Sequence, residues 1–368
     1  MLHTFGSVSF YKKAGVIMTD KLMAYLSEGE AFLVISPENR LYLTGFESTD
    51  GYLLVTAKES VFLTDSRYIE AARAKVTGCT EIALLKNAAE DLNGYIKSLN
   101  INKVYIEASR LSVGQFNSLG ASLDCECLAE KADEAIKELR RTKTESELKN
   151  ICAAQRIAEQ AFEHIRTFIK PGVTDREIGL ELDYFMLRAG AQALSFETIA
   201  VSGRNSSMPH GVPTDKKVER GDFVTMDYGA VVNGYHSDMT RTVAVGEVSG
   251  KQAEVYDTVL KAQLTSLDLL APGVACKAAD AAARDVINAA GYGEFFGHGT
   301  GHGVGVEIHE FPVLNPRSTE ILAPGDVVTV EPGIYLPGEF GVRIEDMAFI
   351  TENGSENLTK CPKTLIIL

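Results

Sequence analysis

The sequence feature that most constrains the fold is an internal duplication in the second half of the chain. Residues 221–227 read Gly-Asp-Phe-Val-Thr-Met-Asp, and residues 325–331, which lie 325 − 221 = 104 positions later, read Gly-Asp-Val-Val-Thr-Val-Glu. Upstream, the Pro-Gly-Val at 171–173 recurs at 272–274, 101 positions later. Solenoid repeats have shorter periods. The duplication therefore predicts one domain built from two related α/β halves.

Residues 18–136 are expected to form a separate α/β domain. Short apolar runs with polar borders predict strands at 31–35, 52–56, 60–64 and 104–107, and a helix is predicted at 91–99. This stretch contains no histidine. The first 17 residues are interpreted as a leader, either an upstream start or an expression remnant. A charged helical stretch at 137–149 opens the second domain, 137–368, and is expected to be a solvent-facing hinge.

The composition limits the classes of function. With 368 residues the chain is long enough for two domains, and 45% hydrophobic with 23% charged residues is ordinary for a soluble globular protein. A net charge of −14 argues against nucleic acid or an anionic membrane as partner. No apolar run approaches the ~20 residues of a membrane-spanning helix. The six cysteines lack zinc spacing, and Cys125 and Cys127 are interpreted as ordinary strand residues, so we expect a cytoplasmic protein with reduced thiols.

The first copy of the repeat is expected to bring two aspartates together. The Asn-Gly at 233–234 favours a two-residue type I′ turn, because both turn positions need positive φ. Such a turn places Asp238 opposite Gly229. Asp227 lies two residues from Gly229 and on the same face, since side chains alternate along a strand. The two aspartates are then diagonal neighbours, roughly 7–8 Å apart at the backbone.

The second copy ends in a similar acidic hairpin. If its turn is centred on Gly338, Glu331 and Glu345 pair directly. Carboxylates that face each other repel unless a cation or protons neutralise them. Because both copies place carboxylates in this way, the sequence favours a two-metal site over four unrelated surface acids.

Five of the seven histidines lie in or near these hairpins in the sequence. His298, His302 and His309 lie in one glycine-rich stretch, where glycine lets the backbone approach a ligand closely. His210 lies in a segment of loop composition at 202–211, just before the first acidic hairpin. His236 shares a face with Asp238, and we expect a neighbouring structural role for it.

With these residues, the chain resembles the metallopeptidases of the pita-bread fold, which include methionine aminopeptidase, prolidase and aminopeptidase P. The resemblance covers almost the whole chain and implies five metal ligands. Asp238 and Glu345 would bridge two metal ions. Asp227 would complete the coordination of one ion, and His302 with Glu331 that of the other.

The N-terminal domain resembles that of the prolidase and aminopeptidase P branch, most clearly at residues 39–46 and 64–68. The expected fold is therefore a creatinase-like α/β domain followed by a pita-bread domain of two α/β halves. The implied substrate is a peptide with proline in the second position, cut before the proline. The resemblance also implies a homodimer.

The implied mechanism assigns a task to each remaining residue. A carboxylate-rich site with one histidine suits Mn²⁺, with Co²⁺ or Zn²⁺ as alternatives, and two metals generate hydroxide from a shared water. Glu331 would carry a proton to the leaving nitrogen. His210 and His309 would donate to the tetrahedral intermediate and the substrate backbone. His298 would shape the pocket beside the proline ring, and Arg343 would either orient the bridging glutamate, meet substrate or form a structural salt bridge.

One departure from the family pattern bears on the substrate. Prolidase-like sequences commonly have an arginine after the proline of the His-Glu-x-Pro segment, where it can hold the carboxylate of a dipeptide. Here that position is Val313, and Arg317 or Arg343 would have to supply the cation. The sequence therefore favours an Xaa-Pro aminopeptidase, with an Xaa-Pro dipeptidase as the alternative. A non-catalytic peptide-binding module is disfavoured because no expected ligand is missing.

Overall fold

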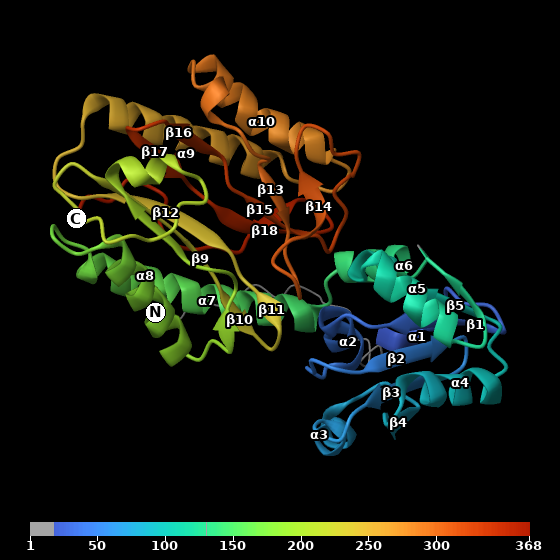
Figure 1. Ribbon diagram of the computed structural model, residues 1–368. Coiled ribbons are helices and arrows are strands. Elements are labelled where there is room, and N and C mark those ends of the chain that lie inside the picture. The colour runs from blue at the N-terminus through green and yellow to red at the C-terminus, as the bar shows by residue number, and fades with distance from the viewer. Residues whose placement is uncertain (1–17, 130) are drawn as a thin grey trace, which may run out of the picture. The chain divides into compact units, whose positions relative to one another are not determined.

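The computed structural model describes residues 18–129 and 131–368 (Figure 1). The chain divides into two compact units, residues 1–139 and 140–368. The expected leader at 1–17 lies outside the described residues. Among the helices that are described, none is long and apolar enough to cross a membrane.

The N-terminal unit is built on a six-stranded mixed sheet in the order β4-β3-β2-β1-β5-β6. Its strands are β1 (Glu30–Val34), β2 (Tyr52–Thr56), β3 (Ser60–Thr64), β4 (Glu81–Leu84), β5 (Lys103–Ile106) and β6 (Glu126–Leu128). Its helices are α1 (Met18–Met23), α2 (Pro37–Thr44), α3 (Ile69–Lys75), α4 (Ala88–Ser98), the 3-10 turn η1 (Ala108–Arg110) and α5 (Val113–Ser122), and α6 (Lys131–Arg141) runs across the boundary, so that its last two residues belong to the second unit. The four strands and the helix predicted here are confirmed, with ends shifted by at most three residues.

The prediction of one continuous charged helix through 137–149 is wrong. Helix α6 ends at Arg141, and α7 (Glu145–Phe168) begins anew after Thr144. The Thr144 hydroxyl accepts from the backbone N–H of Glu147, whose carboxylate accepts from the backbone of Thr144. This capping box starts a helix and so divides the stretch. Nor is the whole stretch solvent-facing, because Arg140 and Lys143 are only 7% and 6% exposed.

The C-terminal unit, residues 140–368, has the expected two halves. The first contains α7, α8 (Asp175–Arg188), β7 (Ala193–Leu194), β8 (Ile199–Ser202), η2 (Gly203–Ser207), β9 (Phe223–Tyr228), β10 (Ala230–Val232), β11 (Tyr235–His236) and β12 (Met239–Ala244). The second contains α9 (Gly250–Leu269), α10 (Cys276–Ala289), η3 (Gly293–Phe295), β13 (Gly301–Gly303), β14 (Glu310–Leu314), β15 (Val327–Val330), β16 (Gly333–Leu336), β17 (Phe340–Arg343), β18 (Asp346–Ile350) and β19 (Ser355–Asn357).

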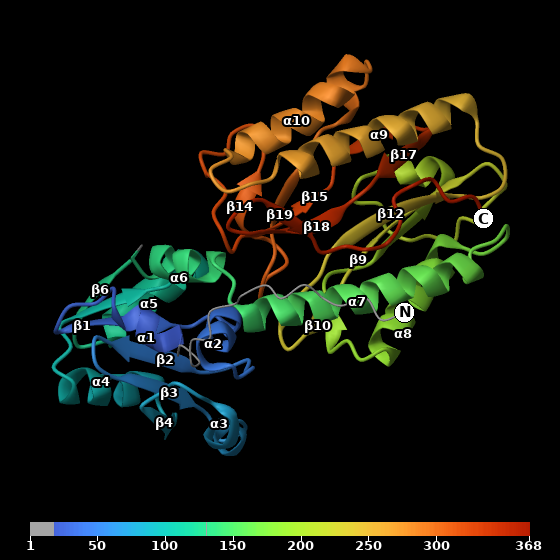
Figure 2. The same cartoon turned by 180° about the vertical axis from the view of Figure 1, so that it is seen from behind.

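The strands of this unit lie between two pairs of helices. In both views α7 and α8 cover one side and α9 and α10 the other (Figures 1 and 2). The first half contributes the sheets β12-β9-β8 and β11-β10-β7, and the second half contributes β14-β13-β15-β18-β19 and the β16-β17 hairpin. The layered arrangement leaves the centre of the strands as the place where both halves meet.

The duplicated sequence passage has a duplicated structure. Gly221 and Gly325 both have positive φ, 92° and 97°, which favours glycine. Asp222 and Asp326 each accept a hydrogen bond from the backbone N–H three residues before them. Each Gly-Asp pair thus closes the turn that starts a strand, β9 in one half and β15 in the other.

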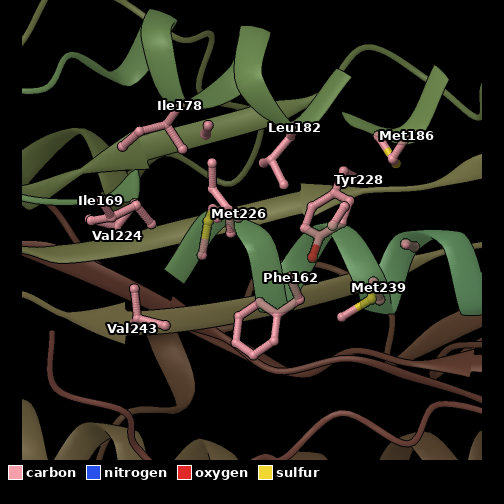
Figure 3. Packing of buried hydrophobic residues seen from close by; sticks show 14 of the residues in the cluster. Phe162, Ile169, Ile178, Leu182, Met186, Val224, Met226, Tyr228, Met239 and Val243 are labelled. Atoms are coloured by element: carbon pink, nitrogen blue, oxygen red, sulfur yellow. The ribbon is translucent and has the colours of Figure 1, made fainter. Parts of the chain in front are cut away.

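The core beside α7 and α8 fixes which way β9 faces. Val224, Met226 and Tyr228 of β9 pack in one buried cluster with α7 and α8 (Figure 3). Phe223 belongs instead to the cluster formed with α9, as alternation along a strand requires. Burying each large apolar side chain stabilises the fold by about 1.5–3 kcal/mol. This packing holds Asp227 on the face away from α7 and α8.

Candidate metal centre

The first acidic hairpin has the predicted register. The two residues at its turn both have positive φ, 51° and 77°. The pairing of β10 with β11 across this turn continues without a shift into β9 and β12, where Asp227 pairs with Thr240. Asp238 therefore lies opposite Gly229 and diagonal to Asp227. The turn chemistry alone was enough to predict this placement.

The second acidic hairpin also has the predicted register. Strands β16 and β17 pair symmetrically about Gly338. Beyond them β15 and β18 pair in the same register, with Val330 opposite Asp346. Glu331 and Glu345 lie between these two sets of pairs, so the common register places them opposite each other.

The carboxylates of both hairpins converge on His302. Asp238, His302 and Glu345 each offer an atom within 4.8 Å of the other two. The His302 Nε2 atom lies 3.6 Å from Asp238 Oδ2 and 3.4 Å from Glu331 Oε1. Asp227 lines the same cavity. The structure thus brings together all five residues that the sequence suggested as ligands.

The oxygen atoms of this cluster fit a cation. Asp227 Oδ1, Asp238 Oδ1 and Glu345 Oε1 are buried, and none has a hydrogen-bond partner among the described residues. Burial, followed by the charges of neighbouring carboxylates, raises the pKa values of Asp238 and Glu345 well above their ordinary range. Burial also raises the pKa of Glu331 to about 8. Buried, unpartnered carboxylate oxygens that face one another are costly without a neutralising ion.

His302 is held in the form that can bind a metal. Its Nδ1 lies 3.0 Å from the carbonyl oxygen of Gly303, so Nδ1–H donates there and the Nε2 lone pair faces the carboxylates. Burial lowers the pKa of His302 to about 4, which keeps the ring neutral. A neutral imidazole oriented through its second nitrogen is the usual histidine ligand.

Arg343 connects ligands from the two halves. Its Nη2 donates to Asp227 Oδ2 at 2.6 Å, and its Nε donates to the Thr240 hydroxyl at 3.0 Å. The Thr240 hydroxyl donates in turn to Glu345 Oε2 at 2.7 Å. Nη1 donates to the hydroxyl of Tyr335 at 2.8 Å and to a backbone carbonyl. Arg343 lines the cavity, yet each nitrogen of its guanidinium is already bonded to protein.

Sequence reasoning missed Thr240 and Tyr335. Thr240 could have been found by extending the predicted register of the first hairpin, which pairs it with Asp227. For Tyr335 the signal is weaker. It pairs with Gly341, and a Cβ built on Gly333 would lie 2.5 Å from its hydroxyl, so glycines make room for the ring.

The remaining histidines of the cavity differ in how they are held. His298 accepts a hydrogen bond from Tyr335 at Nε2 and bonds the carbonyl of Gly299 through Nδ1, at 3.0 and 2.8 Å. Burial above all lowers the pKa of His298 to about 4. His309 packs edge-on against His302 with ring centroids 4.4 Å apart. His210 lies at the exposed side of the cavity.

His236 does not join them. It bonds Ser195 through Nδ1 at 2.8 Å, and the histidines among the described residues that line the cavity are His210, His298, His302 and His309.

The cavity over the cluster has a volume of about 750 Å³ and a mixed lining. Its lining includes the carboxylates and histidines described above. The lining also includes apolar residues, namely Phe196, Ile199, Val212, Pro213, Ile308, Phe311 and Val313. Among the described residues that line it, Arg343 is the one arginine or lysine, and Arg317 is not part of the lining.

Comparison with known proteins gives matches over both units. Residues 149–352 match the family model described as metallopeptidase family M24, and residues 20–142 match the creatinase/prolidase N-terminal domain. An uncharacterized peptidase of Bacillus subtilis is 43% identical over 92% of this chain and 96% of its own length. An Xaa-Pro dipeptidase of Pyrococcus horikoshii is 38% identical over 92% of this chain and 94% of its own.

Solved structures agree with these matches. An Xaa-Pro dipeptidase from Bacillus anthracis superposes with a TM-score of 0.92 at 42% identity, covering 95% of this chain and 99% of that one. An X-Pro aminopeptidase from Thermotoga maritima superposes with a TM-score of 0.87 at 36% identity, covering 92% and 97%.

Proposed function

Because this chain belongs to metallopeptidase family M24 and is a hydrolase that acts on Xaa-Pro bonds, we propose that it is an Xaa-Pro dipeptidase with two divalent metal ions. The observation that carries the proposal is the set of buried, unpartnered carboxylate oxygens that face the neutral ring of His302. Relatives named as dipeptidases support the choice of substrate in both comparisons.

The proposed ligands are Asp227, Asp238, His302, Glu331 and Glu345, with Asp238 and Glu345 shared between the two ions. Four carboxylates and one imidazole are the donor set that hard divalent ions prefer, and we propose Mn²⁺. Ions bound here would polarise the scissile carbonyl and lower the pKa of a water molecule. Arg343 and Thr240 would keep the carboxylates of Asp227 and Glu345 in place.

The other residues act on the substrate. Glu331 would carry the proton to the leaving proline nitrogen, since its carboxylate lines the cavity beside the other proposed ligands. His309 and His210 would donate to the developing oxyanion and to the substrate backbone. His298 would present its ring to the proline, because both of its nitrogens are engaged by Tyr335 and the backbone.

One observation favours an Xaa-Pro aminopeptidase as the second candidate. A dipeptide carboxylate buried in the cavity needs a donor, and the guanidinium of Arg343 is already bonded to Asp227, Thr240 and Tyr335. Val313 lines the cavity where the resemblance led us to expect an arginine.

Hydrolysis of Ala-Pro and Ala-Pro-Ala-Ala by the Mn²⁺-loaded protein, with an EDTA-treated control, distinguishes the two candidates. For a dipeptidase we expect kcat/KM at least about tenfold higher for Ala-Pro, since an extended product side loses the carboxylate contact. Equal or faster cleavage of the tetrapeptide would make the protein an aminopeptidase. Cleavage of neither peptide with Mn²⁺, Co²⁺ or Zn²⁺ would contradict both.

We also propose that the protein is a cytoplasmic homodimer. All six cysteines are free, as expected in a reducing compartment. Light scattering of the purified protein would test the dimer, because a monomeric mass of 39.9 kDa would contradict it.

A further inference from the structure

Glu310 is a buried carboxylate of the cavity wall that has no place in the proposed metal cluster. It follows His309 directly, and its residue is 9% exposed. Its Oε1 accepts the backbone N–H of Glu307 at 3.0 Å. Its Oε2 lies 3.0 Å from the ammonium of Lys143, and Oε1 is paired with the guanidinium of Arg140. Two cations thus meet one buried anion beside a histidine of the cavity.

The loop at 305–310 is folded around this anion. A Cβ built on Gly305 would lie 2.4 Å from Glu310 Oε2, so glycine is what lets the backbone close over the carboxylate. The carbonyl of Gly305 accepts from the backbone of His236 at 2.9 Å. Arg140 pairs with Glu307 as well, at 2.7 Å. The position of the loop, and of His309 within it, is therefore tied to Glu310.

The charges of Glu310, Lys143 and Arg140 are buried deeply enough to affect the position of the loop. Burial alone would raise the pKa of Glu310, but the charges of Lys143 and Arg140 lower it to about 2. The side chains of Lys143 and Glu310 are 1% and 5% exposed. Removing one member of a buried ion pair leaves the charge of its partner uncompensated. The folded state is then strongly destabilised unless the structure rearranges. The loop should move when either cation is removed.

The same short segment contains a salt bridge that serves as an internal control. Arg141 donates from Nε and Nη2 to the two carboxylate oxygens of Asp326, at 2.8 and 3.0 Å. Asp326 is fully buried in the turn before β15, and it is not among the described residues that line the cavity. Cations that are neighbours in the sequence thus hold two different loops. Arg140 and Lys143 hold the 305–310 loop, which contains His309, and Arg141 holds the turn before β15, which contains no histidine of the site.

We propose that Arg140 and Lys143 are positioning residues for His309, acting through Glu310 on the 305–310 loop. The proposal rests on the proposed function, in which His309 donates to the substrate. The ring of His309 lies 4.4 Å from that of His302, so a shift of the loop displaces a donor from the reacting carbonyl. A displacement of about 1 Å at a reacting centre can cost on the order of 100-fold in rate.

The test compares Lys143→Met with Arg141→Met in the full-length, Mn²⁺-loaded protein. We expect Lys143→Met to lower kcat for Ala-Pro by about 10- to 100-fold, with KM within about threefold and metal content unchanged. Arg141→Met should lower the melting temperature while leaving kcat within about threefold. Lys143→Arg, which restores the cation, should recover most of kcat. Equal losses of kcat in both methionine variants, or a loss that follows metal content, would overturn the proposal.

A second variant and a second readout keep the result interpretable. If Lys143→Met does not fold, Glu310→Gln retains the shape of the side chain and should give the same selective loss of kcat. Histidine ring NMR signals of the metal-free protein, which avoids broadening by Mn²⁺, should shift for His309 in Lys143→Met and stay in place in Arg141→Met, with the signal assigned by a His309→Gln variant. An inactive wild-type protein would defeat the proposed function, whereas an unshifted His309 signal in Lys143→Met would defeat the positioning role alone.

Discussion

The two halves of the C-terminal unit present equivalent carboxylates in different surroundings. Asp227 at the end of β9 forms a salt bridge with Arg343 at 2.6 Å, whereas Glu331 after β15 has an oxygen 3.4 Å from Nε2 of the neutral His302 ring. The pKa of Glu331 is raised to about 8, with burial as the main cause. The duplication thus places the two carboxylates at equivalent positions, and their different neighbours give them different chemical properties. In the metal-free protein, one half offers a carboxylate fixed by a guanidinium, and the other offers one that can hold a proton.

The largest effect is expected for a substitution that removes a carboxylate that both metal ions would share. Asp238→Ala should abolish metal loading and reduce hydrolysis of Ala-Pro by more than about 10³-fold, because the variant loses a ligand of each ion. Metal content and activity are measured together, with circular dichroism as the control for folding. Near-normal turnover would contradict a bridging role for Asp238.

Removing the negative charge at each of the two equivalent positions, one at a time, sharpens the comparison. Glu331→Gln should lower kcat by about 10²- to 10⁴-fold even in excess Mn²⁺, since it removes a proton carrier as well as a ligand. Asp227→Asn should lower metal affinity and regain part of its activity as Mn²⁺ is added. Titration of activity with Mn²⁺ separates the two variants, and identical curves would mean that the positions remain equivalent.

Removing the guanidinium of Arg343 tests whether this group accounts for the different surroundings of the two carboxylates. Arg343→Met leaves Asp227 and Thr240 without their donor, and we expect metal affinity to fall by about 10- to 100-fold. Calorimetric titration with Mn²⁺ gives the affinity directly. An unchanged affinity would show that the salt bridge to Asp227 is dispensable for the site.

The smallest expected effect is a pH dependence of stability in the metal-free protein. A carboxyl group whose pKa is raised from 4.5 to about 8 in the folded state binds more protons there than in the unfolded state. The stability that it contributes is therefore lost as pH rises from about 5 to 8. Thermal melts with EDTA should show a fall on the order of a few degrees over this range, and Mn²⁺ should abolish it. Parallel pH profiles with and without Mn²⁺ would contradict the assignment.

Much of the site could be predicted because its information is local. The Asn-Gly turn at 233–234 sets the register of one hairpin, and the symmetry about Gly338 sets that of the other. The alternation of side chains then determines which acids face each other. The strands of the N-terminal unit were predictable for the same reason, since short apolar runs with polar borders define them.

The contacts that could not be predicted join residues that are far apart in the sequence. Arg140 and Arg141 look like solvated charges, yet their carboxylate partners Glu310 and Asp326 lie 170 and 185 residues away. Nothing local distinguishes a buried ion pair of this kind from a surface charge. The same holds for Tyr335, whose hydroxyl meets Arg343 and His298 only after the hairpin has folded against the rest of the unit.

The origin of the two ligands that we propose to be shared has a mechanical consequence. Asp238 comes from the first half and Glu345 from the second, 345 − 238 = 107 positions later. A cation held by both would therefore act as a reversible cross-link between two segments that are otherwise joined by packing and by hydrogen bonds such as that from Thr240 to Glu345. Separation of the two halves would then require release of the ion, so the residues proposed to bind the metal would also stabilise the fold of the unit.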